Sequence, residues 1–404
     1  MDRRGMAWAA SGAMDLTGWP DGPGLGGPPA LVDLVELAAG VLDRRSGGRA
    51  EVDGLALLGE RAALSNLTRH GTISCGGSTR LVRTADGWLA VSLARPEDIA
   101  ALGAWLCADV PPGDPWPAVE RIAGEGDAAA LDDRAALLGL PIAALSSVGP
   151  PAAPAFGLPI GAACLREAAG LPRPIEGALV VDLSALWAGP LCGQLLATAG
   201  ADVVKVESLA RPDGARHGPA AFFDLMNGPK RSVALDLATP GGQGDLRRLI
   251  DAADVVIESA RPRALEQMGI NAAEVLRRPA GPRVWTSITS HGRGPGQAER
   301  VGFGDVAAVA GGLVARDDQG PCFLADAVAD PLCGLVAAAA VLEALVAGGR
   351  WLLSVALAPL AAAVAGPALG VQGAPARPPR ARPSVRPAPP LGSDTATVLR
   401  GLPT

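Results

Sequence analysis

The chain has 404 residues, of which 49% are hydrophobic, so it is long enough for roughly two to three domains with substantial cores. A net charge of -6 gives no reason to expect nucleic acid or an anionic membrane as a partner. The 6 cysteines include no C-x-x-C pair, which indicates neither a zinc site nor a disulfide framework. We therefore expect reduced thiols, no metal and a cytoplasmic location.

The N-terminal region carries no convincing targeting signal, because its short apolar stretch runs into polar and Gly/Pro-rich sequence without a cleavage site. Residues 31–42 have the periodicity of an amphipathic helix. Further along, an Asp-Gly pair at 86–87 lies between two apolar runs, which predicts a β-hairpin. The preceding CGGS sequence at 75–78 predicts a turn.

The stretch from 175 to 207 has the pattern of a strand, a helix and a second strand. Apolar runs at 178–183 and 202–206 flank a segment in which Pro190 suits the first turn of a helix. Such a unit predicts a parallel sheet, whose ligands bind at the carboxyl ends of the strands. The turn at 186–189 (LWAG) lies at that expected crevice, although it lacks the G-x-G-x-x-G pattern of dinucleotide enzymes.

Strands and helices continue to alternate after this unit, as a doubly wound sheet requires. Apolar runs predict strands at 232–237, 254–258 and 283–288. The only two lysines, Lys205 and Lys230, fall in this region, either by chance or because the wide arginine fork does not fit there.

Residues 331–366 are very apolar, but a membrane span is not predicted. Glu343, Arg350 and a Gly-Gly pair interrupt the stretch, which suits a buried helix and strand. A Pro/Arg-rich segment follows at 373–390.

A succession of motifs from Pro174 to the region of Gly366 resembles the family III CoA-transferases, typified by formyl-CoA transferase. In chain order the motifs are PIEGALVVDLSALWAGPLCGQLLATAGADVVKVE, NGPKRSVALDL, ADVVIESARPRALEQMGI, VWTSITSHGRG, VGFGDVAAVAGGL and FLADAVADPLCGL. The C-terminal APPLGSDTATVLRGL is similar to that family's closing helix. The resemblance implies an α/β fold: a Rossmann-like, doubly wound parallel sheet in a large domain, with a smaller α/β domain.

The resemblance implies an enzyme that moves coenzyme A from an acyl-CoA thioester to a carboxylic acid. In this family an aspartate attacks the acyl-CoA carbonyl to give a mixed anhydride, which CoA thiolate converts to an aspartyl-CoA thioester. Asp330, followed four residues later by glycine, matches the nucleophile motif, with Asp326 as the alternative. Because Pro331 follows it, Asp330 is also expected to cap a helix, and both roles can hold at once.

Coenzyme A, as part of the acyl-CoA substrate, is the ligand that the resemblance implies. Leu186, Trp187 and Ala188 fall on the turn that contacts CoA in the family, and Lys230 falls on a matching basic position. The identity of the acyl donor and of the acceptor acid is not encoded in these motifs.

Three positions depart from the family's CoA-binding pattern. A basic residue, an asparagine and an arginine are replaced by Ser208, Ser259 and Gln267. Each replacement removes a hydrogen bond to the CoA nucleotide. Arg261, with Arg211 and Arg263, is a candidate to compensate.

Two other functions remain open. The family includes α-methylacyl-CoA racemases, which use a histidine and an aspartate as acid and base. Residues 302–305, where that histidine is expected, contain none, and His291 lies nearby in a glycine-rich loop. The altered CoA positions also leave open a non-catalytic homologue that serves as the partner of an active subunit.

The N-terminal half is similar to parts of the same family in a different order. Residues 11–18 and 28–58 loosely repeat the run at 311–359, with Glu36 or Asp33 at the nucleophile position. We expect a partial large-domain repeat (1–60), a small α/β domain (61–150), a linker (151–173), the CoA-binding large domain (174–372), and a Pro/Arg-rich linker with a closing helix (373–404).

The resemblance also bears on assembly and on the CGGS turn. Relatives form interlocked homodimers, so a homodimer is expected, with a heteromer containing a related subunit as the alternative. The CGGS sequence at 75–78 corresponds either to the family's mobile glycine-rich loop over the reactive intermediate or to an ordinary turn.

Overall fold

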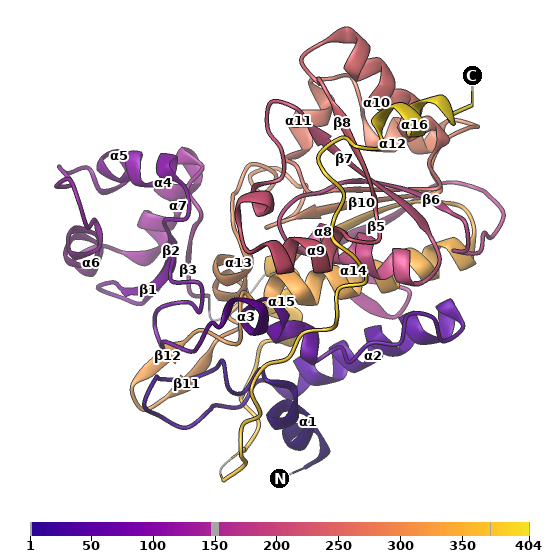
Figure 1. Cartoon of the computed structure of the whole chain (residues 1–404). Helices are drawn as coiled ribbons and strands as arrows, with labels where there is room; N and C mark the ends of the chain where they lie inside the picture. The colour runs from indigo at the N-terminus through magenta and orange to yellow at the C-terminus, as the bar shows by residue number, and fades with distance from the viewer. Residues whose placement is uncertain (1, 147–152, 372, 404) are drawn as a thin grey trace.

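The computed structural model describes residues 2–146, 153–371 and 373–403, which form a larger and a smaller lobe (Figure 1). The larger lobe contains an eight-stranded sheet and the smaller lobe a three-stranded sheet. The strands are β1 (Thr79–Arg83), β2 (Trp88–Ser92), β3 (Ile142–Ala144), β4 (Ala153–Ala155), β5 (Leu158–Ala168), β6 (Leu179–Leu183), β7 (Asp202–Ser208), β8 (Arg231–Leu235), β9 (Val255–Glu258), β10 (Val284–Thr289), β11 (Ala315–Asp317), β12 (Gly320–Cys322) and β13 (Arg350–Ala356). The α-helices are α1 (Arg3–Ser11), α2 (Pro29–Ser46), α3 (Glu60–Ser65), α4 (Pro96–Ala100), α5 (Leu102–Leu106), α6 (Trp116–Gly124), α7 (Ala128–Leu138), α8 (Ala188–Thr198), α9 (Ala220–Asn227), α10 (Pro240–Ala252), α11 (Pro262–Glu266), α12 (Ala272–Arg277), α13 (Gly304–Ala310), α14 (Ala329–Ala347), α15 (Leu357–Val364) and α16 (Thr395–Arg400).

The large sheet has the strand order β4-β5-β13-β10-β9-β6-β7-β8. The six strands from β13 to β8 are parallel to their neighbours, and numbered along the chain they follow the doubly wound order 3-2-1-4-5-6 when read from β8. The expected Rossmann-like fold class is therefore confirmed. The topological switch point, where such folds bind ligands, lies between β6 and β9.

Helices cover both faces of this sheet, which is why its strands are apolar on both sides. Val180 and Val255 face one layer, with α8 and α14, whereas their neighbours Val181 and Val256 face the other layer, with α10 and α12. The sequence runs at 178–183 and 254–258 therefore read as continuous apolar strands.

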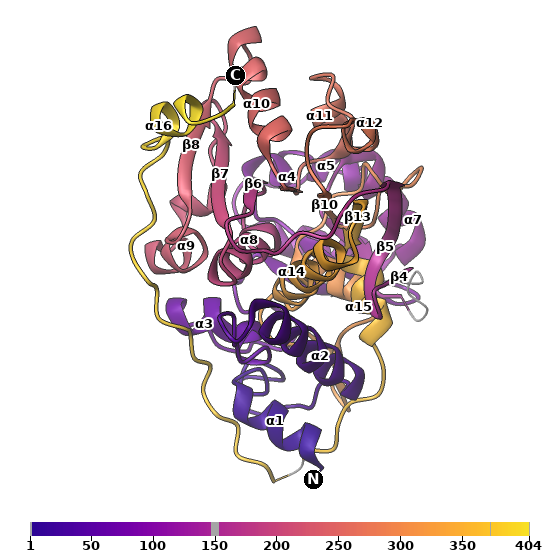
Figure 2. The same ribbon diagram turned by 90° about the vertical axis from the view of Figure 1, so that its right-hand side faces the viewer.

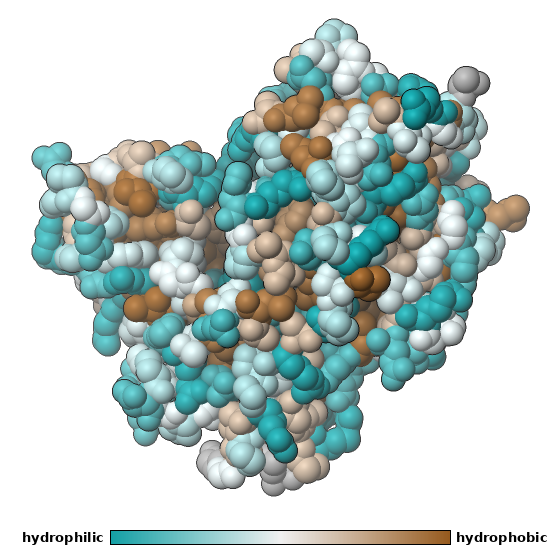
Figure 3. Space-filling view, in the orientation of Figure 1, coloured by the Kyte–Doolittle hydropathy of each residue, from teal (hydrophilic) through white to brown (hydrophobic). Residues whose placement is uncertain are grey.

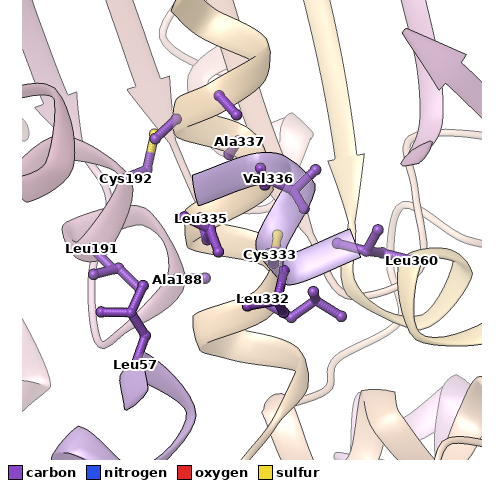
Figure 4. Packing of buried hydrophobic residues seen from close by; sticks show 14 of the residues in the cluster. Leu57, Ala188, Leu191, Cys192, Leu332, Cys333, Leu335, Val336, Ala337 and Leu360 are labelled. Carbon is purple, nitrogen blue, oxygen red and sulfur yellow. The ribbon is translucent and has the colours of Figure 1, made fainter. Parts of the chain in front are cut away.

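Helix α14 is the centre of the larger lobe and lies between α8 and α2 (Figure 4). Gly334 permits the close contact with α8, because a Cβ there would lie 2.6 Å from the carbonyl oxygen of Ala188. Among the described residues, α14 is long and apolar enough to cross a membrane, and 83% of its most apolar window is buried inside the protein. The buried helix and strand expected over 331–366 are observed as α14 and β13.

The linker expected over 151–173 is, for residues 153–168, part of the large sheet. Strand β5 pairs antiparallel with β13, and β4 pairs antiparallel with β5. The expectation was wrong because the segment has no regular alternation of apolar and polar residues, while strand β13 supplies hydrogen-bond partners for its backbone. Residues 147–152, which include the expected boundary at 150, lie outside the described residues.

The smaller lobe is a sheet with helices on one face and part of the larger lobe on the other. The predicted hairpin is confirmed, since β1 and β2 pair antiparallel around the Asp-Gly turn. Helices α5, α6 and α7 cover one face, and α13 packs on the other. Figure 3 shows a hollow between this lobe and the large sheet. The ion pair of Arg300 with Asp132 joins the two lobes.

The N-terminal segment (residues 2–65) and the Pro/Arg-rich strap (residues 373–390) lie against each other below the sheet (Figure 2). The amide of Arg377 donates to Ala9 O (3.0 Å), and Arg382 forms a bidentate ion pair with the buried Glu60 of α3. The strap then leads to α16, whose Thr395 Oγ1 accepts from a backbone amide of edge strand β8. The closing helix therefore covers the edge of the sheet.

Candidate active site

Residues 184–187 form a strained turn between β6 and α8. Leu186 has φ 69°, a value that a residue with a bulky side chain rarely adopts. The turn is held by two hydrogen bonds, from Ala185 N to Ser259 Oγ (3.0 Å) and from Leu186 N to Asp213 Oδ1 (3.0 Å). Ser259, the residue that replaces a CoA-binding asparagine, thus ties together the loops that follow β6 and β9 at the switch point.

The two lysines are buried around this turn. Lys205 Nζ donates to Ser184 O at 2.9 Å. Lys230 Nζ donates to Asp182 Oδ2 (2.8 Å), Pro190 O (2.9 Å) and Asn227 Oδ1 (3.0 Å). Burial lowers the pKa of Lys230, and the Asp182 carboxylate opposes that shift. Gly193 leaves little room beside Nζ, which suits a compact ammonium better than a guanidinium.

The expectation that Lys230 contacts CoA is therefore wrong in this structure. Its side chain is 1% exposed and its donors are engaged inside the protein. Lys230 instead fixes the first turn of α8 to β6 and α9, and so supports the turn that carries Leu186, Trp187 and Ala188.

Four charged side chains converge beside this turn. They are Arg61 from α3, Asp305 from α13, Asp326 from the loop before α14, and Asp330 from α14. Arg61 binds Asp326 in a bidentate ion pair, with Nε to Oδ2 at 2.9 Å and Nη2 to Oδ1 at 2.5 Å. The same guanidinium lies over the indole ring of Trp187, with Cζ 4.9 Å from the ring centroid. The turn at 186–188 and the carboxylates are therefore parts of one site.

Asp330 lies in the first turn of α14, and its Oδ2 accepts a hydrogen bond from Gly304 N (3.1 Å). The helix begins at Ala329 after Val328, so Asp330 is not the N-cap that its neighbour Pro331 suggested. Asp330 is partly exposed, as a group that attacks a substrate must be, whereas Asp326 is fully buried. The geometry therefore favours Asp330 over Asp326 as the reacting carboxylate.

The surroundings of Asp330 and Asp305 raise the pKa values of both carboxyl groups to near neutral pH. Desolvation raises the pKa of Asp330 to about 7, while the Arg61 charge and the Gly304 amide act in the opposite direction. Desolvation and the neighbouring Asp326 raise the pKa of Asp305 to about 7 as well. Near pH 7 the cluster therefore exchanges protons readily.

Backbone strain is concentrated at the site. Ala325 (φ 51°) and Ala327 (φ 44°) flank Asp326 in left-handed conformations, as Leu186 does in the turn. The CGGS turn lies against the same loop, because Cys75 Sγ donates to Ala325 O (3.5 Å). A Cβ on Gly76 would lie 3.4 Å from Arg61 Nη2, so residues 75–78 pass directly beside the charged cluster.

Arg261 precedes α11 and faces the smaller lobe across the hollow. Its Nη2 would lie 3.5 Å from a Cβ on Gly139, at the end of α7. Desolvation and the nearby Arg263 lower the pKa of Arg261, and no ion pair links it to an acidic side chain among the described residues. Arg261 is thus a cation near the end of α7 that has no ion-pair partner among the described residues.

Glu36 and Asp33, which were expected at the nucleophile position of an N-terminal repeat, lie elsewhere. Glu36 pairs with Arg3, and Asp33 pairs with Arg4, both on the surface of α2. His291 lies in the loop after β10, and both of its ring nitrogens are buried without a hydrogen-bond partner. Desolvation lowers its pKa to about 3, far from the neutral value that suits a general base.

Arg61 and Asp305 are the site residues that the sequence did not point to. Arg61 and Asp326 are 265 positions apart, and no motif surrounds Arg61. Asp305 belongs to the GFGD stretch at 302–305, so its acidic side chain within a family motif was a signal that could have pointed to the site. Within the described ranges, no group of three His, Cys, Asp or Glu side chains is arranged to hold a metal ion.

Comparison with known proteins points to one family. The sequence profile of CoA-transferase family III matches residues 175–392, which is more than half of the chain. Succinyl-CoA–D-citramalate CoA-transferase of Chloroflexus aurantiacus is 33% identical over 184 residues, which cover 43% of this chain and 46% of that protein. Succinate–glutarate CoA-transferase of Agrobacterium fabrum is 34% identical over 189 residues, with coverage of 43% and 47%. The chain thus spans about half the length of the curated relatives it matches.

A crystal structure of a CAIB/BAIF family protein from Brucella suis is 32% identical and aligns with 48% of this chain and 55% of its own, at a TM-score of 0.44. The profile match, together with the motif order around the turn and Asp330, settles the relationship. The chain belongs to CoA-transferase family III.

Proposed function

We propose that this protein transfers coenzyme A from an acyl-CoA thioester to a carboxylic acid, with Asp330 as the covalent nucleophile. Its curated relatives are CoA-transferases, which supports CoA transfer in general. The observation that carries the proposal is the position of Asp330. It is a partly exposed carboxylate beside the Leu186–Ala188 turn, at the end of the sheet where doubly wound folds bind ligands.

The chemistry follows from a carboxylate beside a hydrogen-bond donor. An oxygen of Asp330 attacks the thioester carbonyl carbon, the C–S bond breaks, and CoA leaves as a thiolate. The thiolate then attacks the Asp330 carbonyl of the mixed anhydride, which releases the first acid and leaves an aspartyl-CoA thioester. The acceptor carboxylate reverses both steps. Gly304 N, which already donates to Asp330 Oδ2, is placed to stabilise the negative charge that develops on that oxygen.

For CoA itself, we propose two sets of contacts. The backbone of Leu186, Trp187 and Ala188 lines the mouth of the site, and Leu186 is 44% exposed there. Arg261 faces the hollow between the lobes without an acidic partner, and its guanidinium suits a phosphate of the CoA nucleotide. Lys230 has no part in this arrangement.

The test is incubation of the purified chain with a panel of acyl-CoA thioesters, followed by intact-mass measurement. We expect a covalent adduct of the acyl group or of CoA, and its loss in Asp330→Ala. Glu36→Gln is the matched control, because it changes the corresponding acidic residue of the N-terminal repeat on the surface of α2. The acceptor acid is then identified as the carboxylate that discharges the adduct.

Three results would overturn or redirect the proposal. An adduct that survives in Asp330→Ala would assign the nucleophile to another residue, with Asp326 the first to examine. Exchange of the substrate α-proton without transfer would indicate a racemase. The absence of an adduct with every thioester, alongside activation of a related subunit, would indicate a non-catalytic partner.

We also propose that the chain works in the cytoplasm as a homodimer. The six cysteines are free thiols, which suits a reducing compartment. Light scattering of the purified protein at micromolar concentration and fractionation of the producing cells would test these two points. A monomer, or a stable complex with a related subunit, would contradict the homodimer.

A further inference from the structure

The cation of the site comes from a part of the chain that the family profile does not match. The profile covers residues 175–392, whereas Arg61 belongs to α3 in the N-terminal segment. Arg61 pairs with Asp326 of the loop before α14, and its charge acts on Asp305 of α13 and Asp330 of α14. This contact across the molecule has no counterpart in the motifs that identify the family.

We propose that Arg61 is the residue that keeps Asp330 negatively charged for attack on the acyl-CoA thioester, and that Asp326 is the anchor that holds Arg61 in position. The inference rests on the proposed CoA transfer. Arg61 acts through Asp330 and is therefore a positioning residue, not one that reacts.

The first argument is geometric. Asp326 is 0% exposed and binds both Nε and Nη2 of Arg61, which fixes the guanidinium plane. Stacking on Trp187 fixes the other side of the same group. An arginine held by a bidentate partner and by a ring cannot swing away from the carboxylates.

The second argument concerns charge. The groups that face Asp330 are Arg61 from α3, Asp305 from α13, Asp326 from the preceding loop, and the Gly304 amide. The nearby Cys75 thiol stays neutral, because burial raises its pKa. Arg61 is therefore the positive charge that offsets three acidic groups. Without it, desolvation favours the protonated form of Asp330, which is a poor nucleophile.

The third argument is that α3 is itself braced. Glu60, the neighbour of Arg61, is 1% exposed and receives a bidentate ion pair from Arg382 of the strap. The strap thereby holds the helix that carries Arg61, and so two regions distant in the chain keep the cation in place.

The experiment compares Asp326→Asn with the double variant Arg61→Met/Asp326→Asn. Removing Asp326 first matters, because Arg61→Met alone leaves an unpaired buried carboxylate whose own protonation blurs the result. The rate of adduct formation with acyl-CoA is measured from about pH 5 to about pH 9. The rate should fall at low pH as Asp330 becomes protonated, and we call this part of the profile the acidic limb. The pH midpoint of the acidic limb should lie about 1 pH unit or more higher in the double variant than in Asp326→Asn. Below both midpoints the double variant should then react roughly tenfold more slowly.

Two further variants separate charge from structure. Arg61→Lys/Asp326→Asn keeps the positive charge, so its acidic limb should lie closer to that of Asp326→Asn than the limb of Arg61→Met/Asp326→Asn does. Arg45→Met removes an arginine that pairs with Glu343, farther along the same α14, and should leave the limb unchanged. The amide oxygen in Asp326→Asn can still accept a hydrogen bond from Arg61, and the Trp187 ring remains beneath the guanidinium, so Arg61 stays in the site in the reference variant. An equal limb in Asp326→Asn and the double variant, or an equal displacement in Arg45→Met, would overturn the inference.

A second readout distinguishes this inference from the proposed function. The ionisation of Asp330 is followed by ¹³C NMR of carboxyl-labelled aspartate, with Asp330→Asn to assign its signal. If the wild type forms no adduct, the CoA-transfer proposal fails. The NMR midpoint then still decides whether Arg61 controls Asp330: a rise in the double variant supports the inference, and an unchanged midpoint contradicts it.

Discussion

Helices α14 and α2 carry the same spacing of an acidic residue and a glycine, in opposite surroundings. In α14, Asp330 is desolvated beside Gly304 N and close to Arg61. In α2, Glu36 points to solvent and pairs with Arg3, at a side-chain exposure of 34%. The two helices pack against each other, so their chemical difference arises within one hydrophobic core.

The comparison teaches that the motif alone does not make a nucleophile. The motif places a carboxylate four residues before a glycine on a helix, and the elements around that carboxylate decide its charge. For α14 these elements are α13, the strained loop at 325–327 and the N-terminal segment. For α2, Asp33 and Glu36 pair with arginines of α1 at the surface.

The largest difference between α14 and α2 is expected when the acidic residue of each helix is replaced. Asp330→Ala should lower the rate of CoA transfer by about 10³-fold or more, because the covalent route is lost. Glu36→Gln should leave the rate within a factor of about two, since Glu36 lies in a surface ion pair. Steady-state assays of both variants check this. Equal losses would mean that the repeat contributes to the reaction.

The pH dependence of stability should reveal the desolvated carboxylates. The folded-state pKa values of Asp330 and Asp305 are both about 7, above those of the unfolded chain. Their contribution to the free energy of unfolding is therefore largest below about pH 4 and is lost as the pH rises to about 7, a change on the order of a few kcal/mol. Urea unfolding at several pH values measures this. Asp330→Asn should flatten the profile, and an unchanged slope would contradict the assignment.

The glycine of each motif, Gly334 in α14 and Gly40 in α2, also differs in how tightly it is packed. A Cβ on Gly334 would lie 2.6 Å from Ala188 O and 3.0 Å from Leu191 Cβ, so Gly334→Ala should destabilise the protein by about 1–3 kcal/mol. A Cβ on Gly40 would meet only the end of the Arg44 side chain, at 3.1 Å. Gly40→Ala should therefore stabilise α2 by up to about 1 kcal/mol. Thermal unfolding of the two variants should give shifts of opposite sign.

The smallest effect is expected from the ion pair between the two helices. Arg45 of α2 forms a bidentate ion pair with Glu343 of α14, but the Arg45 side chain is 41% exposed. Arg45→Ala should lower the free energy of unfolding by at most about 1 kcal/mol, since the apolar contact between the helices remains. A larger loss in urea unfolding would mean that the ion pair, and not the core, holds the repeat in place.

The fold was largely predictable because the strands of the large sheet are covered on both faces. Their apolar runs coincide with β6 to β10 to within a few residues, and the motif order pointed to Asp330 and to the turn at 186–189. Strand β5 was missed, since Pro159 and Gly161 break its pattern and β13 supplies its hydrogen bonds. Local sequence does not record such a partner.

The site was predictable only in part, because side-chain environment depends on elements far apart in the chain. Lys230 has the residue type of a phosphate ligand, yet the packing of β6, α8 and α9 buries it. Arg61 has no local signature, and its role depends on a partner 265 positions away. Both outcomes follow from tertiary contacts that no short motif encodes.

The contact between α2 and α14 can form only late in synthesis of the chain. Arg45 and Glu343 are 298 positions apart, so during synthesis the apolar face of α2 emerges long before its partner. Until α14 is made, residues such as Leu31 and Leu42, which end fully buried, remain open to water and to other nascent chains. The charged cluster also forms late in synthesis, because Arg61 pairs with Asp326 only after α3 packs against the loop before α14. The N-terminal segment therefore completes its packing only after the C-terminal part of the large lobe has been synthesised.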